Sequence, residues 1–304
     1  MSKTINSFWR NYAPTVVLLL FITGLAVWVH STGTIKAESI PVGMPKAIAL
    51  LTIGLFAGVL GGLIGTGGCS VMLPAIHFWM GYPAPVAIGT TLFAVIFTAL
   101  SGGYAHLVRR NLDVNATLWL GSSGILGVAV GSWLFTMLAG HAPLLGLLLG
   151  LAFLWPAARM IWESLAAGTR GVKREGATIP ASGMGLAALG SVIGILTGLV
   201  GLGGGYALVP GLIYLFHAPV YVTMGTSLAT MIPLAIVGGG IKLAQGFVDM
   251  GAGLLLAGGT IVGAQIGAAV ITRFKPATLK LIFGVYFLYV AVKFVTTYFG
   301  VTIW

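Results

Sequence analysis

The hydrophobic part of this sequence contains an internal duplication, which constrains the fold more than any other feature. Residues 58–131 align without a gap with residues 194–267, at a constant offset of 136. The glycine-rich stretches near the start of each copy match, and Pro74 matches Pro210. Two hydrophobic halves that are broken by glycine at matching places are typical of secondary transporters, whose substrate site lies between the repeats.

The composition indicates a membrane protein. Hydrophobic residues make up 58% of the sequence and charged residues only 7%, whereas about a quarter of a typical soluble domain is charged. The net charge of +10 would suit a nucleic-acid partner, but the basic residues lie at the ends of apolar segments, where they act as topology signals. We therefore expect the lipid bilayer as the surroundings of this chain, and no nucleic acid.

The apolar pattern predicts an all-α polytopic protein. The expected helices lie at residues 13–30, 46–65, 70–80, 86–107, 115–138, 143–165, 182–201, 206–217, 222–244, 250–271 and 278–299. Segments 70–80 and 206–217 are too short to cross a bilayer alone, and each follows a run of glycines. We interpret each as the return arm of a hairpin that turns inside the membrane, where irregular backbone must face protein or a water-filled cavity.

Basic residues favour one topology. If each half is a broken-helix hairpin plus three crossings, and the N-terminus is cytoplasmic, most basic residues lie in the cytoplasm, as the positive-inside rule requires. The cytoplasmic set is Lys3, Arg10, Arg109, Arg110, Arg159, Arg170, Lys173, Arg174, Arg273, Lys275 and Lys280, and the opposite set is Lys36, Lys46, Lys242 and Lys293. The odd number of crossings makes the repeats inverted; if segment 70–80 crossed fully, they would be parallel.

This topology gives four parts of the chain. Residues 1–45 form an extra N-terminal transmembrane anchor helix and a loop, and residues 46–165 form the first repeat. Residues 166–181 form a polar cytoplasmic linker, and residues 182–304 form the second repeat. We expect a multi-pass protein of the cell (inner) membrane.

Three pairs of motifs resemble one known family. They are Gly62-Leu-Ile-Gly-Thr-Gly-Gly68 with Gly198-Leu-Val-Gly-Leu-Gly-Gly-Gly205, Gly89-Thr90-Thr91 with Gly225-Thr226-Ser227, and Asn111-Leu-Asp113 with Gly246-Phe-Val-Asp249. As a set, over about residues 45–299, they resemble the TauE/SafE family of sulfite and organosulfonate exporters, also called the 4-toluene sulfonate uptake permease family. The family often has a histidine ahead of the Gly-x-x-Asp turn; His106 fits that place, and Lys242 replaces it in the second half.

The resemblance implies transport of a small sulfur-containing anion, and the motifs offer suitable chemistry. A broken helix exposes N–H groups and a positive dipole end, which together bind anions, and glycine lets the backbone approach an oxyanion closely. The helices that begin near Cys69 and Gly205 would aim such ends at the middle of the membrane. The candidate substrate-binding residues are Gly67, Gly68, Cys69, Thr90, Thr91, Gly203, Gly204, Gly205, Thr226, Ser227, His106, Lys242 and Gln265.

Each candidate also has a purely structural interpretation. The hydroxyl residues that follow Gly89 and Gly225 would cap helix starts, and His106 and Lys242 would extend toward the interface from helix ends. Gln265 would hydrogen-bond across helices, and Cys69 would be a small packing residue. We expect Asp113 and Asp249 to cap helices or to pair at helix junctions.

Other functions remain open at this point. A passive anion channel, a carrier of a non-sulfur organic anion and a membrane scaffold share most of these features. An intramembrane serine protease built on Gly121-Ser122-Ser123-Gly124 lacks a histidine base near the serine, so we expect no enzyme. We also expect no cofactor and no metal. The glycine-rich outer faces allow a homodimer without requiring one.

Overall fold

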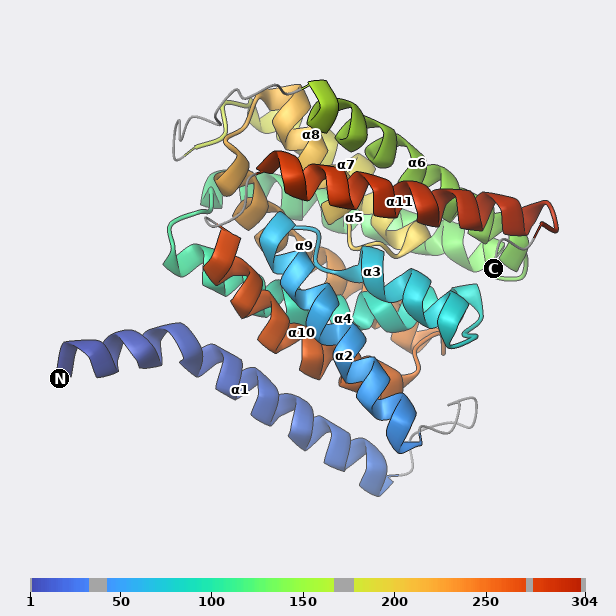
Figure 1. Cartoon of the computed structure of the whole chain (residues 1–304), viewed down its shortest axis with the longest axis horizontal. Helices are drawn as coiled ribbons and strands as arrows, with labels where there is room; N and C mark the ends of the chain where they lie inside the picture. Colours follow the sequence, from blue (N-terminus) through green and yellow to red (C-terminus); the bar gives the residue numbers. More distant parts are fainter. Residues whose placement is uncertain (1, 33–42, 167–177, 272–275, 302–304) are drawn as a thin grey trace.

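The computed structural model describes residues 2–32, 43–166, 178–271 and 276–301, and the regular elements in these ranges are helices (Figure 1). Helix α1 (Ser2–Thr32) precedes two sets of helices. The first set is α2 (Met44–Ile64), α3 (Cys69–Pro74), the π-helix η1 (Ala75–Trp79), α4 (Ala84–Val108), α5 (Val114–Leu138) and α6 (Ala142–Ala166). The second set is α7 (Gly183–Val200), α8 (Gly205–Phe216), α9 (Val220–Ala244), α10 (Met250–Val270) and α11 (Pro276–Tyr298).

Seven helices in the described ranges are long and apolar enough to cross a bilayer, namely α2, α4, α5, α6, α7, α9 and α10. Four shorter segments are also apolar: Ala13–Val29 in α1, Cys69–Trp79, α8, and Gly284–Tyr298 in α11. The all-helical polytopic architecture is therefore confirmed. The boundaries of the later helices lie close to the predicted ones, whereas α1 begins at Ser2 and not at residue 13. The loop after α1, residues 167–177 of the predicted linker and residues 272–275 lie outside the described residues, as do Lys36, Arg170, Lys173, Arg174, Arg273 and Lys275.

The return arm of the first half is not the single α-helix that the sequence predicts. It is α-helical as far as Pro74 and continues as the π-helix η1. Proline has no N–H to donate and crowds the preceding turn, which fits a change of helix type at this residue. The end of the arm is held by His77, whose ring stacks on Phe294 with 5.4 Å between centroids. The Nδ1 atom of His77 also lies 2.7 Å from the carbonyl oxygen of Tyr82.

Helices α4 and α9 occupy equivalent positions in the two halves and form the buried centre of the bundle. They run antiparallel. Gly238 of α9 lies against Leu92 of α4, whereas Gly102 of α4 lies against Leu228 of α9. These two contacts are related by the same offset of 136 residues that relates the two halves of the sequence. One half therefore repeats the contacts of the other, with the direction of the central helix reversed.

The first long helix of each half packs against the fourth helix of the other half. Helix α2 lies against α10, and α7 lies against α5. Glycines make both approaches close: a methyl group added at Gly58 would lie 2.7 Å from Cα of Thr260, and one added at Gly198 would lie 2.6 Å from the backbone nitrogen of Ser132. Small residues at such interfaces allow the tight backbone packing that holds helices together in lipid. The two halves are therefore interlocked.

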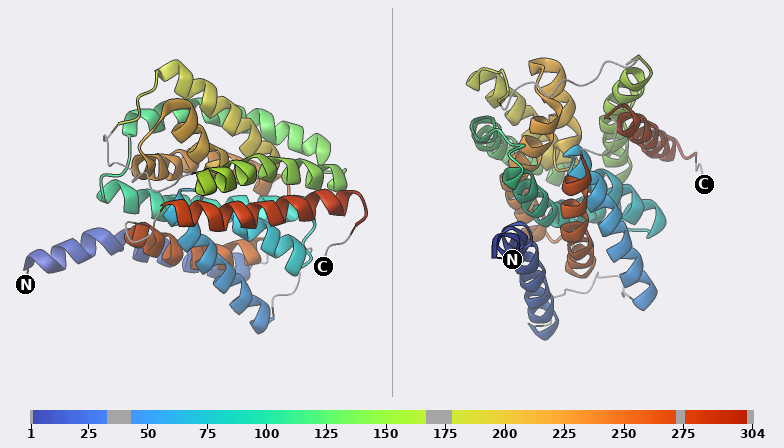
Figure 2. Two further views of the ribbon diagram at one scale, coloured as in Figure 1. Left: turned by 45° about the horizontal axis from the view of Figure 1, so that its top comes forward. Right: turned by 60° about the vertical axis from the view of Figure 1, so that its left-hand side comes forward.

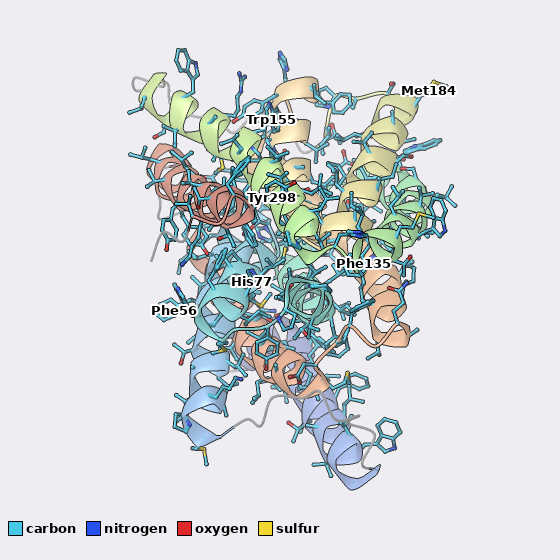
Figure 3. The ribbon with its side chains drawn as sticks, turned by 90° about the vertical axis from the view of Figure 1, so that its right-hand side faces the viewer. Phe56, His77, Phe135, Trp155, Met184 and Tyr298 are labelled. Atoms are coloured by element: carbon cyan, nitrogen blue, oxygen red, sulfur yellow. The ribbon has the colours of Figure 1, made fainter. Side chains whose placement is uncertain are left out.

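The remaining helices cover the outside of this core. Helices α6 and α11 pack on each other (Figure 1), and α1 lies on the opposite side of the bundle, against α10 and α4 (Figure 2). Figure 3 shows Phe56 and Met184 at the periphery, where they are 62% and 83% exposed. Large apolar side chains on the outer surface are expected when the surrounding solvent is lipid.

Candidate functional site

Two glycine turns reverse the chain between the long and the short arm of each half. Gly65, Gly67 and Gly68 have φ angles of +79°, +71° and +75°, and the matching Gly203 and Gly204 have +69° and +80°. Residues with a Cβ atom rarely adopt this left-handed conformation, whereas glycine does so readily. The chain therefore turns after α2 and after α7 where the sequence supplies glycine; that each turn lies inside the membrane stays a prediction.

The two turns meet each other in the buried centre of the protein. A methyl group added at Gly205, the first residue of α8, would lie 2.6 Å from Cα of Thr66 and 2.7 Å from the carbonyl oxygen of Gly65. In the equivalent contact of the other half, the thiol of Cys69, the first residue of α3, donates to the carbonyl of Leu202. The two glycine turns, residues 65–68 and 201–204, thus pack against each other at their ends (tip to tip). Cys69 fills space at this junction, as its structural interpretation proposed.

Val95 and Met231 close the junction from the sides of α4 and α9. They occupy equivalent positions near the middle of these two helices. A methyl group added at Gly203 would lie 2.6 Å from Cε of Met231 and 3.2 Å from Cγ1 of Val95, and Gly67 lies against the same two side chains. The tips therefore sit halfway along the two central helices. The sequence analysis did not single out Val95 and Met231, although their spacing of 136 residues was visible.

Thr90 and Thr226 do not cap their own helices. Helices α4 and α9 begin at Ala84 and Val220, close to the predicted residues 86 and 222. Both threonines therefore lie more than one turn inside, and the interpretation that they cap helix starts was wrong. Instead, the hydroxyl of Thr226 accepts a hydrogen bond of 2.9 Å from the N–H of Asp113, and the hydroxyl of Thr90 accepts one of 2.9 Å from the N–H of Asp249.

The neighbouring hydroxyls make different contacts. Thr91 donates to the carbonyl of Ala87 in its own helix at 2.8 Å, whereas Ser227 donates to the carbonyl of Gly65 at 2.8 Å. Ser227 therefore ties α9 to the end of α2. This bond links Ser227 to the glycine junction, because Gly65 also contacts Gly205.

The two aspartates cap helices, as predicted. Asp113 accepts a hydrogen bond of 3.0 Å from the N–H of Ala116, and Asp249 accepts one of 3.1 Å from the N–H of Ala252. The second carboxylate oxygen of Asp249 also accepts a bond of 3.0 Å from the hydroxyl of Tyr82. Burial, together with this carboxylate, raises the pKa of the Tyr82 phenol, so the hydroxyl stays protonated and acts as a donor.

His106 and Lys242 are equivalent in sequence but differ in their contacts. Both are fully buried, which excludes the interpretation that they extend toward the interface. The Nε2 atom of His106 lies 3.0 Å from the carbonyl oxygen of Gly62. The Nζ atom of Lys242 lies 3.1 Å from the ring centroid of Phe135 and has no hydrogen-bond partner among the described residues. A buried ammonium group without a hydrogen-bond partner is costly, so Lys242 is the stronger candidate for binding an anion.

Gln265 joins α10 to α4. Its side-chain nitrogen donates to the carbonyl of Ser101 at 3.1 Å, and the hydroxyl of Ser101 donates back to the carbonyl of Ile261 at 2.8 Å. The interhelical hydrogen bond expected for Gln265 is confirmed. This pair of bonds satisfies polar groups that have no access to water.

The structure brings the predicted residues together in part. Gly67, Gly68, Cys69, Gly203, Gly204 and Gly205 share the central junction. Thr90 and Thr226 lie near the starts of two antiparallel helices, and His106 and Lys242 lie near the ends of the same helices. Among the described residues, no group of histidine, cysteine, aspartate or glutamate side chains is arranged to hold a metal ion.

Broken helices that meet inside a bundle of membrane-length helices define a polytopic membrane protein of the transporter class. The profile described as "Sulfite exporter TauE/SafE" matches residues 50–294. The chain belongs to this family, and it is a multi-pass membrane transporter. No solved structure matches it.

Similar proteins have corresponding names. The chain is 27% identical to the probable membrane transporter protein YunE of Bacillus subtilis, over 77% of this chain and 92% of that protein. It is 28% identical to the probable membrane transporter protein YdhB of the same organism, over 76% and 93%. A probable membrane transporter protein of Xylella fastidiosa is 26% identical, over 80% and 93%.

Proposed function

We propose that this protein is a secondary transporter that exports a small sulfur-containing anion, of the sulfite, sulfonate or thiosulfate class, across the inner membrane. The observation that carries the proposal is the tip-to-tip contact of the two glycine turns, halfway along the central helices α4 and α9. In transporters built from repeats, discontinuous helices meet at the midplane and form the substrate site there. The family description supplies the class of substrate.

Inverted repeats are part of the proposal. The antiparallel course of α4 and α9 supports them, because these helices hold equivalent sequence positions and the contacts of Leu92 and Leu228 are reciprocal. Placing the N-terminus in the cytoplasm puts Arg109, Arg110 and Arg159 on the cytoplasmic side, in agreement with the positive-inside rule. Access would alternate by rocking of one half against the other, with the glycine turns as the moving parts.

The direction of transport follows from electrostatics. Asp113 and Asp249 cap helices at the ends of spans, so they do not offer a proton-carrying carboxylate in the middle of one. An inside-negative potential contributes about 2.3 kcal/mol per charge per 100 mV. Export of an anion is then downhill without a coupling ion, whereas uptake would require one.

Anion efflux from proteoliposomes under an imposed inside-negative potential tests this function. Sulfite, thiosulfate, sulfoacetate and lactate would be compared, with empty liposomes as the control. We expect saturable, potential-driven efflux of a sulfur anion and counterflow when the anion is present on both sides. Flux that rises linearly with concentration and shows no counterflow would indicate a passive anion channel. Efflux of lactate alone would indicate a carrier of non-sulfur organic anions.

A further inference from the structure

A groove with a volume of about 510 Å³ lies between α1 and the first part of α10, and Leu51 of α2 closes one side of it. Helix α1 runs along the outside of the bundle beside α10 (Figure 1). The lining residues lie between Leu19 and Val29 on α1 and between Gly251 and Gly258 on α10. On both helices they recur at helical spacing, so each helix contributes one face to the groove.

The surface of this groove is hydrocarbon. Among the described residues that line it, Thr23 has the only polar side chain, and its hydroxyl donates to the carbonyl of Leu19 in its own helix at 2.8 Å. Gly251 and Gly258 add no side chain to the α10 wall, which leaves the space open. A water molecule needs two to four polar partners to be held in a cavity, so this groove does not hold ordered water.

The length of the groove matches one leaflet of a bilayer. The stretch of α1 from Leu19 to Val29 covers about 15 Å along the helix axis, at about 1.5 Å per residue. The hydrocarbon core of a bilayer is about 30 Å thick, so the groove spans half of it. Val29 lies close to the end of α1 at Thr32. With the N-terminus in the cytoplasm, as proposed above, the groove therefore opens to the outer leaflet.

The width of the groove suits a chain and not a helix. Ile22 and Val29 are 6% and 4% exposed, so α1 lies on the bundle along this stretch, and a further helix about 10–12 Å across does not fit between. One water-sized group needs roughly 10–15 Å³ of such space, so 510 Å³ has room for roughly a few tens of them. An acyl chain is narrow, apolar and one leaflet long, and the bilayer around this membrane protein supplies it.

Packing gives such a chain a reason to stay in the groove. Within a bilayer the hydrophobic effect does not draw apolar surfaces together, so van der Waals contacts decide which surfaces associate. Side chains that face an empty space lose those contacts. A chain in the groove touches Ile22 of α1 and Leu254 of α10 at the same time, whereas a lipid on the outer surface touches the protein on one side only.

We propose that this groove binds one acyl chain of a membrane phospholipid, which attaches α1 to α10 within a single leaflet. Most of the α1 helix that forms one wall lies before residues 50–294, the part that the family profile matches. Membership of the family therefore does not imply this site. The site is also independent of which anion the protein transports, because it lies on the outside of the bundle and away from the glycine junction.

Photolabelling with a phospholipid that carries a diazirine in one acyl chain tests the inference. The full-length protein would be reconstituted into vesicles of phosphatidylethanolamine and phosphatidylglycerol that contain this probe, then dissolved in detergent, separated from free lipid and irradiated. Mass spectrometry of peptides locates the label. Detergent replaces lipid that touches only the outer surface, so residues 19–29 and 251–258 should carry at least about tenfold more label than the peptide with the exposed Leu126 and Trp133 of α5.

Two variants fill the groove from opposite walls. Ala26→Phe does so from α1 and Gly258→Leu from α10. A methyl group at Gly258 would lie 3.5 Å from Cδ2 of Leu51, which is an ordinary contact, so the start of the new side chain fits. Each variant should lower the label about tenfold or more, because the chain loses many carbon contacts at once. Gly24→Leu is the matched control: Gly24 does not line the groove, and a methyl group there meets nothing within 4 Å. Its label should equal that of the wild type.

Three results would overturn the inference. The first is equal label on the groove and on the outer face of α5 in the wild type. The second is wild-type label in a filled variant that elutes as a folded protein. The third is a wild-type dimer without lipid label that dissociates in the filled variants, which would show that a second copy covers the groove. Loss of label in both filled variants, with full label in Gly24→Leu, would support the lipid site.

Discussion

The backbone N–H of Asp249 donates a hydrogen bond of 2.9 Å to the hydroxyl of Thr90, and Asp113 makes the same bond to Thr226. Each bond joins one half of the protein to the other. Because each aspartate also caps the helix that follows it, the same residue fixes a helix start and attaches it to the opposite half. The two interlocking contacts lie near the starts of α4 and α9, at opposite ends of the central helix pair.

Replacing Thr90 by valine should destabilise the protein. The substitution keeps the shape of the side chain but leaves the buried N–H of Asp249 without its acceptor, which costs about 1–3 kcal/mol. Thr91→Val is the control, because the hydroxyl of Thr91 bonds only carbonyls of its own helix, which keep their helical partners. Thermal unfolding in one detergent should show a clear loss for Thr90→Val and a smaller one for Thr91→Val. Equal losses would contradict this role for Thr90.

Replacing Gly263 by alanine should separate α10 from α2. The added methyl group would lie 2.7 Å from the backbone nitrogen of Val59 and 3.0 Å from the carbonyl carbon of Gly58. Backbone atoms of a packed helix cannot move aside singly, so we expect a loss of about 1–3 kcal/mol. Gly240→Ala, which meets nothing within 4 Å, should be neutral or slightly stabilising, since alanine favours a helix by up to about 1 kcal/mol over glycine. Unfolding free energies would decide between them.

The contact between Gly203 and Met231 can be measured with a double-mutant cycle. Gly203→Ala places a methyl group 2.6 Å from Cε of Met231, at a residue whose φ is +69°. Met231→Ala removes the steric contact but leaves the backbone strain, which costs about 1–2 kcal/mol. The double variant should therefore be less destabilised than the sum of the two single variants. Strict additivity of the four unfolding free energies would show that Met231 does not press on the glycine turn.

Methionine substitutions at His106 and Lys242 should have effects of opposite sign. Lys242→Met removes a buried ammonium group that has no hydrogen-bond partner among the described residues, together with its contact to the ring of Phe135. A desolvated cation–π contact is worth about 2 kcal/mol, which is less than the cost of burying an unpaired charge, so stability in the absence of a transported anion should rise. His106→Met removes the contact with the carbonyl of Gly62 and should lower stability by about 1 kcal/mol. Midpoints of thermal unfolding would reveal the signs. A loss of stability in both variants would show that the contact of Lys242 with the ring of Phe135 outweighs the cost of burying its ammonium group.

Most of the secondary structure followed from local sequence signals. Long apolar segments, the glycine runs and the aspartates before α5 and α10 predicted the helices, the turns and two caps. The capping role expected for the threonines after Gly89 and Gly225 was wrong, because α4 and α9 begin at Ala84 and Val220, more than one turn before them. Local propensity alone does not distinguish a threonine that caps its own helix from one whose hydroxyl accepts a hydrogen bond from a backbone N–H far away in the sequence.

The site was predictable only in its repeated part. The duplicated glycines located the junction, because a matching break in two apolar halves is visible in a single sequence. His106 and Lys242 are equivalent by sequence position. In the structure His106 lies within hydrogen-bond distance of the carbonyl of Gly62, whereas Lys242 has no hydrogen-bond partner among the described residues.

The sequence by itself determined that this chain is an all-helical membrane protein with two broken halves, because bilayer thickness and glycine turns act locally on the chain. Only the tertiary structure decided which helices meet. The packing of α2 on α10, the bond from Asp249 to Thr90 and the contact of Gly205 with Thr66 all join residues far apart in sequence. Such contacts depend on how the two halves interlock, and that depends on close packing in three dimensions rather than on any local pattern.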